Sequence, residues 1–145
     1  MYDEIKVIQN ETNRLRYIVH ENDEKPEEEK IGKKDELFVQ LERYMNEQKP
    51  YTNPGLNRKM LADALNTNEK YLRDAIKNNV NATVNDYITF YRLKYANKLL
   101  LLPAEDYTID AVAMDAGFNS RASFYEYYRA TYGLTPNEFR KIVSK

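Results

Sequence analysis

A pattern of ten residues occurs twice in this chain, and it constrains the fold more than any other feature. The first copy is Asn57, Leu61, Ala62, Leu65 and Asn66, followed by Asn68, Leu72, Ile76, Asn81 and Thr83. The second copy is Thr108, Val112, Ala113, Ala116 and Gly117, followed by Ser120, Phe124, Tyr128, Gly133 and Thr135. The first five residues of the two copies are 51 positions apart and the last five are 52 apart. The segment between the two halves of the pattern is therefore one residue longer in the second copy. This repeat predicts two similar structural units in tandem.

Each copy has the signals of two short helices joined by a tight turn. Short polar residues such as Thr108 and Ser120 precede apolar residues at helical spacing, as N-caps do. Asn or Gly follows each helix, where the chain needs a left-handed backbone conformation. Phe124 and Tyr128 lie on one face of the second helix of the second copy, which leaves another face free. The pattern therefore predicts a helix-turn-helix, whose free second helix suits a DNA major groove.

Over about residues 35 to 145, the chain resembles the DNA-binding domain of the AraC/XylS family of bacterial transcription regulators. The resemblance lies in two runs, LADALNTNEKYLRDAIKNNVNATVNDYITFYRLKYANKLL and AVAMDAGFNSRASFYEYYRATYGLTPNEFR. Its most specific elements are GF-x-S-x-x-x-F, G-x-TP and FR. The chain departs from the family pattern at four positions. Ala122 replaces a frequent Ser, Tyr128 replaces the usual Phe, and Asn66 and Asn81 replace frequent glycines.

The resemblance implies which side chains of each second helix, the recognition helix, read bases. These positions are Lys70, Arg73 and Asp74 in the first unit, and Arg121, Ala122, Tyr125 and Glu126 in the second. Arginine can donate paired hydrogen bonds to guanine, and a carboxylate can accept one from cytosine N4. The residues expected to contact the DNA backbone are Asn68, Lys77, Thr83, Ser120, Arg129 and Thr135. The expected partners are double-stranded DNA and RNA polymerase.

Helical spacing predicts the elements around the two units. A helix that starts at Lys34 has one apolar face, made of Leu37, Leu41, Tyr44 and Met45. The run KPYTNPG after it predicts a loop. The remaining predicted elements are a first helix-turn-helix at about 57–78, a linker helix at 83–102, a second helix-turn-helix at 108–132 and a terminal helix at 135–144. The linker helix is apolar on several sides, with Tyr95, Leu99 and Leu102 in one stripe, which predicts burial against more than one neighbour.

The first 34 residues differ in character from the rest. Ile5, Ile8, Thr12, Leu15 and Val19 follow heptad spacing, so residues 1–20 predict either an amphipathic helix or a short dimer-forming coiled coil. Residues 21–34 are densely charged and predict a flexible linker. The predicted fold class is therefore all-α, with two tandem helix-turn-helix units joined by a long linker helix and preceded by this helix and linker. We expect a longer protein, with a homodimer formed through upstream segments and a possible link to a membrane sensor.

The composition argues against catalysis and cofactor binding. The chain has no Cys and one His, His20, so neither a thiolate site nor a histidine cluster can form. Ser120 fits an N-cap better than a nucleophile, and the four glycines sit at turns rather than in a phosphate loop. No apolar run reaches membrane-spanning length, and we expect a cytoplasmic protein that is not an enzyme. The formal charge of −1 leaves a protein-interaction module as the alternative, but residues 69–98 carry six basic and three acidic side chains.

Overall fold

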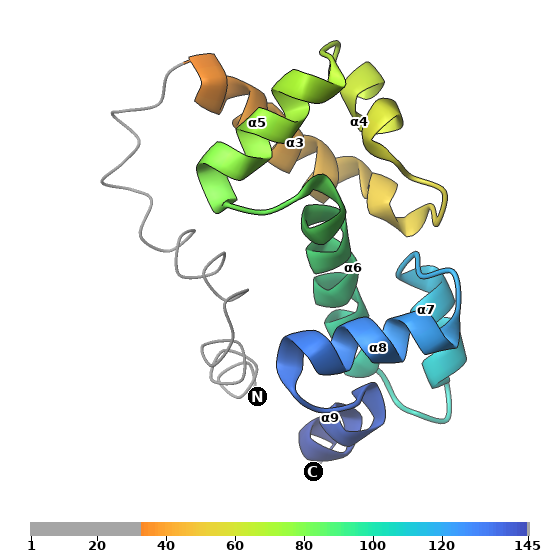
Figure 1. Cartoon of the computed structure of the whole chain (residues 1–145). Helices are drawn as coiled ribbons and strands as arrows, with labels where there is room; N and C mark the ends of the chain where they lie inside the picture. The colour runs from red at the N-terminus through yellow and green to blue at the C-terminus, as the bar shows by residue number, and fades with distance from the viewer. Residues whose placement is uncertain (1–32, 145) are drawn as a thin grey trace. The chain divides into compact units, whose positions relative to one another are not determined.

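The computed structural model describes residues 33–144, and every regular element in that range is helical. The elements are α3 (Lys33–Gln48), the 3₁₀ helix η3 (Pro50–Thr52), α4 (Arg58–Ala64), α5 (Glu69–Val80), α6 (Val84–Leu100), α7 (Ile109–Asp115), α8 (Arg121–Tyr132) and α9 (Pro136–Val143) (Figure 1). The all-α prediction is confirmed for this part of the chain. The helix predicted at 1–20, His20, and the linker up to residue 32 lie outside the described residues.

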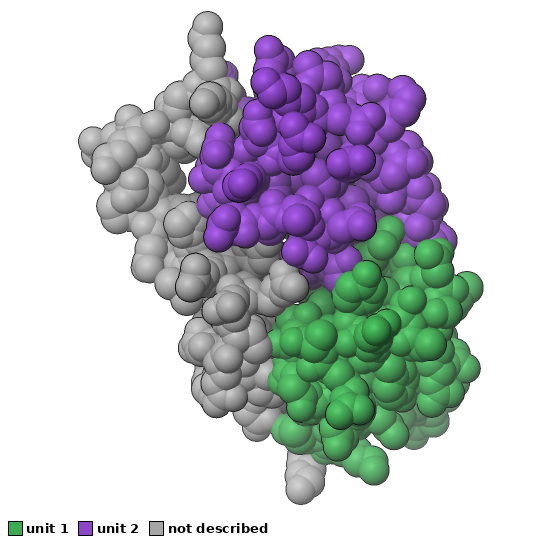
Figure 2. Space-filling view, viewed as in Figure 1, with its two compact units in different colours: residues 1–16, 91–145 green, residues 17–90 purple. Residues whose placement is uncertain are grey.

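The chain divides into two compact units, which Figure 2 shows in purple and green. The N-terminal unit comprises, among the described residues, 33–90, with α3, η3, α4, α5 and the start of α6. The C-terminal unit comprises residues 91–144, with the rest of α6 and α7 to α9. Each unit contains one copy of the repeated pattern, α4–α5 in the first and α7–α8 in the second.

The core of the N-terminal unit packs α3 against α5. Phe38, Leu41 and Met45 of α3 are buried, and the Phe38 ring lies 5.8 Å from that of Tyr87, centroid to centroid. Leu72, Ala75 and Ile76 of α5 are buried as predicted, as are Leu61 and Ala62 of α4. The predicted face of α3 was partly wrong, because Leu37 and Tyr44 are only half-buried while Phe38 is buried.

The core of the C-terminal unit is largely aromatic. Phe124 and Tyr128 of α8 are buried, and Tyr128 packs against Tyr132 with a ring separation of 4.7 Å. Phe139 of α9 and Phe118 of the turn complete the aromatic part. Tyr128, predicted on the apolar face of its helix, is thus a core residue, and burial of such large rings accounts for much of the stability of a small unit.

The predicted N-caps are confirmed in both units. The side chains of Asn57, Asn68, Thr108 and Ser120 each accept a hydrogen bond from the backbone N–H three residues later, at 2.8–3.1 Å. Thr135 forms a capping box with Glu138, in which each side chain accepts from the other residue's backbone N–H. The predicted left-handed positions are confirmed too, with positive φ at Asn66, Asn81, Gly117 and Gly133.

Several predicted boundaries were wrong. α5 continues to Val80 instead of ending at residue 78, because the left-handed stop is Asn81. α6 ends at Leu100 instead of Leu102: Pro103 disfavours helical backbone at the residue before it, and the last bonds are of the tighter i→i−3 kind. Leu102 is 44% exposed, so it lies outside the buried stripe.

Two further corrections concern the start of the described chain. α3 begins at Lys33, inside the predicted linker. The KPYTNPG run is not a simple loop, because Pro50–Thr52 form η3 and Tyr51 is buried. A proline at the first position suits such a helical turn, and the ring of Tyr51 contributes to the core.

Candidate nucleic-acid interface

The first predicted recognition helix corresponds to α5, which projects a row of basic side chains. Leu72, Ala75 and Ile76 bury its inner face, so the remaining positions point outward. Lys70, Arg73 and Lys77 are exposed, and their spacing of three and four residues places them along one face. Asp74 is half-buried beside them. This face combines two lysines and an arginine with one carboxylate, which suits phosphate contact and base reading together.

The second predicted recognition helix corresponds to α8, which begins at Arg121 directly after its N-cap Ser120. Arg121, Ala122, Glu126 and Arg129 are exposed as predicted. Tyr125, by contrast, is half-buried. It packs against the core of the C-terminal unit, and its ring meets that of Phe124 edge-on at a centroid distance of 6.2 Å. Tyr125 therefore lies at the edge of the exposed face of α8, partly packed against the core, and is not fully exposed as predicted.

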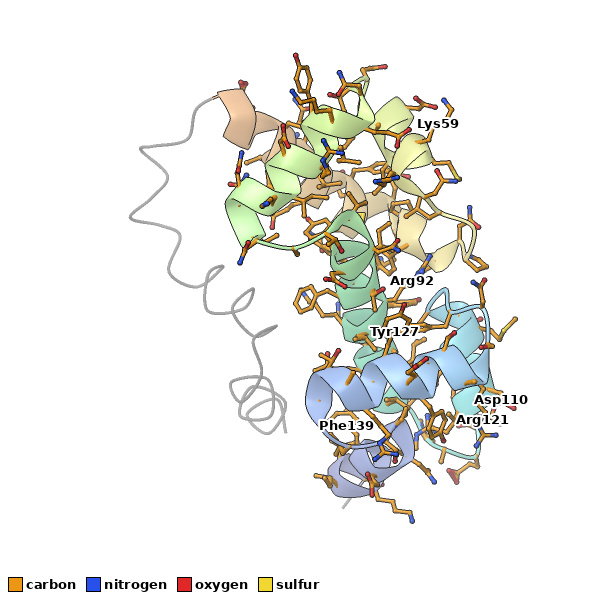
Figure 3. All side chains as sticks on the ribbon, viewed as in Figure 1. Lys59, Arg92, Asp110, Arg121, Tyr127 and Phe139 are labelled. Atoms are coloured by element: carbon orange, nitrogen blue, oxygen red, sulfur yellow. The ribbon has the colours of Figure 1, made fainter. Side chains whose placement is uncertain are left out.

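Arg121 is held by contacts from two helices. Its Nη1 lies 3.4 Å from Asp110 Oδ1 on α7, and its Nη2 donates to Tyr125 Oη at 3.4 Å. Its guanidinium carbon also lies 5.2 Å from the centre of the Tyr125 ring. Figure 3 shows Arg121 next to Asp110. The hydrogen bond with Tyr125, assisted by the charges of Tyr125 and Asp110, raises the pKa of Arg121.

The first helix-turn-helix has a matching ion pair with the opposite polarity. Arg58 Nε at the start of α4 lies 3.6 Å from Glu69 Oε1 at the start of α5. In the C-terminal unit the acid, Asp110, is on the first helix and the base, Arg121, is on the recognition helix. Both pairs therefore connect the starts of two successive helices.

The predicted backbone-contacting residues are mainly helix caps, and their acceptor atoms are occupied. Asn68 Oδ1 accepts from the N–H of Tyr71, and Ser120 Oγ accepts from that of Ser123. Thr83 Oγ1 accepts from the N–H of Asp86 at 3.0 Å and so caps α6. A hydroxyl or amide that caps in this way still has a donor for a phosphate.

Thr135 is the least suited of the predicted backbone contacts. Its own N–H donates to Glu138 Oε1 at 2.9 Å, so the carboxylate sits at the start of α9. That negative charge occupies the position an incoming phosphate would take. The first turn of α8 has no acidic residue, so its cap Ser120 is the better candidate, whereas α5 carries Glu69 in its first turn.

A buried network of hydrogen bonds connects α8 to α6. Tyr128 Oη donates to Asn97 Oδ1 of α6 at 2.6 Å, and Asn97 Nδ2 donates to Tyr132 Oη at 3.2 Å. Burial raises the pKa of Tyr128 well above its usual value, with a smaller contribution from Tyr132, so the hydroxyl stays protonated and keeps donating. On α9, Arg140 Nε donates to the carbonyl of Leu100 at the end of α6.

Sequence reasoning missed three exposed side chains beside the predicted site. Tyr71 is 59% exposed in the first turn of α5, next to Lys70 in the sequence. Arg58 and Asp110 form the two ion pairs between helix starts. Their positions one and two residues after an N-cap were visible in the sequence, but the direction of each side chain across the turn was not.

The described residues offer little for other chemistry. Among the side chains that the structure describes, residues 36–144, no group of three or more His, Cys, Asp or Glu could hold a metal ion. None of the described helices is long and apolar enough to cross a membrane.

Comparison with known proteins gives a family match that covers both units. A family model described as "Helix-turn-helix domain" matches residues 61–142, more than half of the chain. The transcriptional activator RhrA of Rhizobium meliloti is 31% identical over 62 residues, which cover 43% of this chain and 20% of that protein. The uncharacterized transcriptional regulatory protein YesN of Bacillus subtilis is 32% identical over 91 residues, which cover 61% of this chain and 24% of that protein.

A solved structure supports the fold independently. The C-terminal domain of the two-component response regulator yesN from Fusobacterium nucleatum superposes with a TM-score of 0.61. Its sequence is 22% identical, and the superposition covers 70% of this chain and 95% of that domain. The likeness shows a shared fold. The match to the curated regulators spans only about a quarter of their length or less.

Proposed function

We propose that this chain, which belongs to the AraC-type family of helix-turn-helix domains, binds double-stranded DNA sequence-specifically as the output domain of a bacterial transcription regulator. The observation that carries the proposal is the pair of capped recognition helices, α5 and α8. Each buries one face in its own unit and exposes charged side chains on the other. A short helix with a free polar face matches the way helix-turn-helix domains enter the major groove.

The exposed side chains divide into two proposed roles. Arg73 and Arg121 read guanine through paired hydrogen bonds, while Asp74 and Glu126 accept from cytosine N4. Lys70, Ala122 and Tyr125 complete the base-reading set, because they lie in the first two turns of α5 and α8. Phosphate contacts come from Asn68, Lys77, Thr83, Ser120 and Arg129. A phosphate contact at Thr135 is weaker, because the Glu138 carboxylate accepts the Thr135 N–H.

The two recognition helices are proposed to occupy successive major grooves on one face of the duplex. Such grooves are about 34 Å apart. α6 has 17 residues, which corresponds to about 25 Å along its axis, and residues of both units belong to it. In this proposal α6 sets the spacing between α5 and α8, and a duplex whose site does not match must bend, at a cost of about 1 to 6 kcal/mol.

Binding to duplexes at low and high salt tests the proposal against its alternative, a helical protein-interaction module. The full chain should bind a random-sequence duplex at low salt, and its affinity should fall steeply as salt rises, because phosphate contacts release counterions. Selection from a random duplex library should then enrich one sequence family. Absence of duplex binding at low salt would favour the interaction module.

The partners of the whole protein follow from the same proposal. RNA polymerase is the partner through which a bound regulator would act, and dimerisation through segments upstream of residue 33 would double the DNA site. The compartment that this function requires is the bacterial cytoplasm, whether or not a membrane sensor is attached. Pull-down of RNA polymerase by the chain on a selected duplex would test the first of these.

A further inference from the structure

The reversed polarity of the two ion pairs singles out Asp110. In the N-terminal unit the recognition helix begins with the acid Glu69, which suits the positive end of the helix dipole. In the C-terminal unit it begins with Arg121, a cation in the less favourable position, and Asp110 lies 3.4 Å away on the preceding helix. The chain thus places a carboxylate beside a proposed base-reading arginine.

Three contacts fix the Arg121 side chain before DNA is present. Asp110 and the Tyr125 hydroxyl both bind the guanidinium, and the Tyr125 ring lies beneath it at 5.2 Å. The Arg121 and Asp110 side chains are 60% and 66% exposed, so the pair is within reach of a ligand. An exposed ion pair shifts an equilibrium only by about two- to fivefold, so DNA can displace it.

We propose that Asp110 is a positioning residue that sets the base preference of Arg121, an inference that rests on the proposed function. An arginine at a helix start can bind either a phosphate or a guanine edge. The carboxylate of Asp110 repels a phosphate, which disfavours the sequence-independent contact. A guanine edge is neutral and offers two acceptors in the plane of the guanidinium. The carboxylate of Asp110 therefore weakens the contact between Arg121 and guanine less than the contact between Arg121 and a phosphate. Asp110 therefore gives specificity by opposing the wrong contact.

The test substitutes Asp110→Asn in the full chain. Affinities are measured for a duplex selected by the wild-type chain, for that duplex with single base pairs changed, and for a random duplex. The random-duplex affinity should rise by about two- to fivefold, and discrimination at one base pair should fall by a similar factor. The slope of log affinity against log salt should steepen by about 0.9 on the random duplex, the value for one added phosphate contact.

Matched variants distinguish the proposed positioning role of Asp110 from a general effect of net charge and from a loss of stability. Asp115→Asn changes the charge by the same amount on the same helix, but Asp115 accepts a hydrogen bond from Tyr107, so discrimination should stay at the wild-type value. Asp110→Glu keeps the carboxylate and should keep the discrimination. In an Arg121→Ala background, Asp110→Asn should no longer change the base preference.

Two results would overturn the inference while leaving the proposed function intact. One is wild-type discrimination in Asp110→Asn; the other is the same loss of discrimination in Asp115→Asn. A wild-type chain that binds no duplex would instead overturn the proposed function, and this inference with it. Melting curves followed by circular dichroism show whether each variant is folded, and Asp110→Ala, which also removes the carboxylate, provides the test if Asp110→Asn is not.

Discussion

The two helix-turn-helix units share their local structure but differ in charge. Both have polar N-caps, a buried alanine on the first helix and a left-handed residue after each helix. The helices α4 and α5 carry five basic and three acidic side chains, whereas α7 and α8 carry two basic and three acidic. We therefore expect the N-terminal unit to supply most of the attraction to phosphate, and the C-terminal unit to contribute more through base selection.

The cores of the two units differ as well. Asn97, Thr131 and Arg140 are the buried polar or charged side chains among residues 36–144, whose side chains the structure describes, and all three lie in the C-terminal unit. The N-terminal unit has Ile76 where the C-terminal unit has Tyr128, so no hydroxyl needs a partner there. The comparison shows that the same position of the repeat can be filled by an apolar side chain or by a hydrogen-bonded one.

The largest expected effect tests whether the two units depend equally on their central core residue. Leu72 and Phe124 occupy the same place in the repeat, and each is fully buried. Leu72→Ala should cost about 2 to 5 kcal/mol and Phe124→Ala about 3 to 5 kcal/mol, because each leaves a cavity. Urea unfolding followed by circular dichroism measures both. A loss below 1 kcal/mol in either unit would contradict the packing described for it.

The second prediction tests the hydrogen-bonded core. Tyr128→Phe removes the donor to Asn97 Oδ1 and should cost about 1 to 3 kcal/mol, since a buried acceptor is left unsatisfied. Ile76→Val, at the matching place in the N-terminal unit, should cost about 0.5 to 1.5 kcal/mol through volume alone. Adding Asn97→Leu to Tyr128→Phe should recover part of the loss. Equal stability of Tyr128→Phe and the wild type would show that the network contributes nothing.

A third prediction compares DNA binding by the two units. Arg121→Ala should cost about 1 to 3 kcal/mol on a selected duplex and relax the preference at one base pair. Lys77→Ala should weaken binding to all duplexes alike and reduce the salt slope by about 1. Fluorescence anisotropy at several salt concentrations distinguishes the two patterns. If Arg121→Ala lowered affinity equally for every sequence, its base-reading role would be wrong.

The smallest effect concerns the left-handed residues that end the recognition helices. A Cβ at Gly133 would meet no atom within 4 Å, so Gly133→Ala should cost only the backbone strain at φ 81°, about 1 to 2 kcal/mol. Asn81→Gly should change stability by less than about 1 kcal/mol, because φ 54° suits both residues. Thermal unfolding of the two variants, compared with the wild type, measures both stability changes. A larger effect at Asn81 would point to a role of its side chain beyond the turn.

The sequence predicted those features of the fold that depend on neighbouring residues. Each N-cap bonds three residues ahead, and each left-handed turn needs only one permissive residue, so Asn57, Ser120 and Gly117 could be assigned directly. The repeat then placed α5 and α8, and with them the outward faces that carry the candidate site.

What the sequence did not predict depends on distant contacts. Leu37 and Phe38 are equally apolar, and only the orientation of α3 against α5 decides that Phe38 is the buried one. Asn97 is a core residue because it bonds to hydroxyls 31 and 35 residues later, and nothing in its neighbouring sequence indicates those partners. The ion pairs of Arg58 and Asp110 likewise depend on how two helix starts meet across a turn.

A hydroxyl-radical footprint of the full chain on a duplex that it has selected tests the central claim, reading by two helices, most directly. The account predicts protection over two adjacent major grooves on one face, with centres about 10 base pairs apart. Substituting Arg73 or Arg121 by Ala should weaken protection of one groove in each case. Protection of a single groove at saturating protein would contradict the account and leave one of the two units without a role in reading DNA.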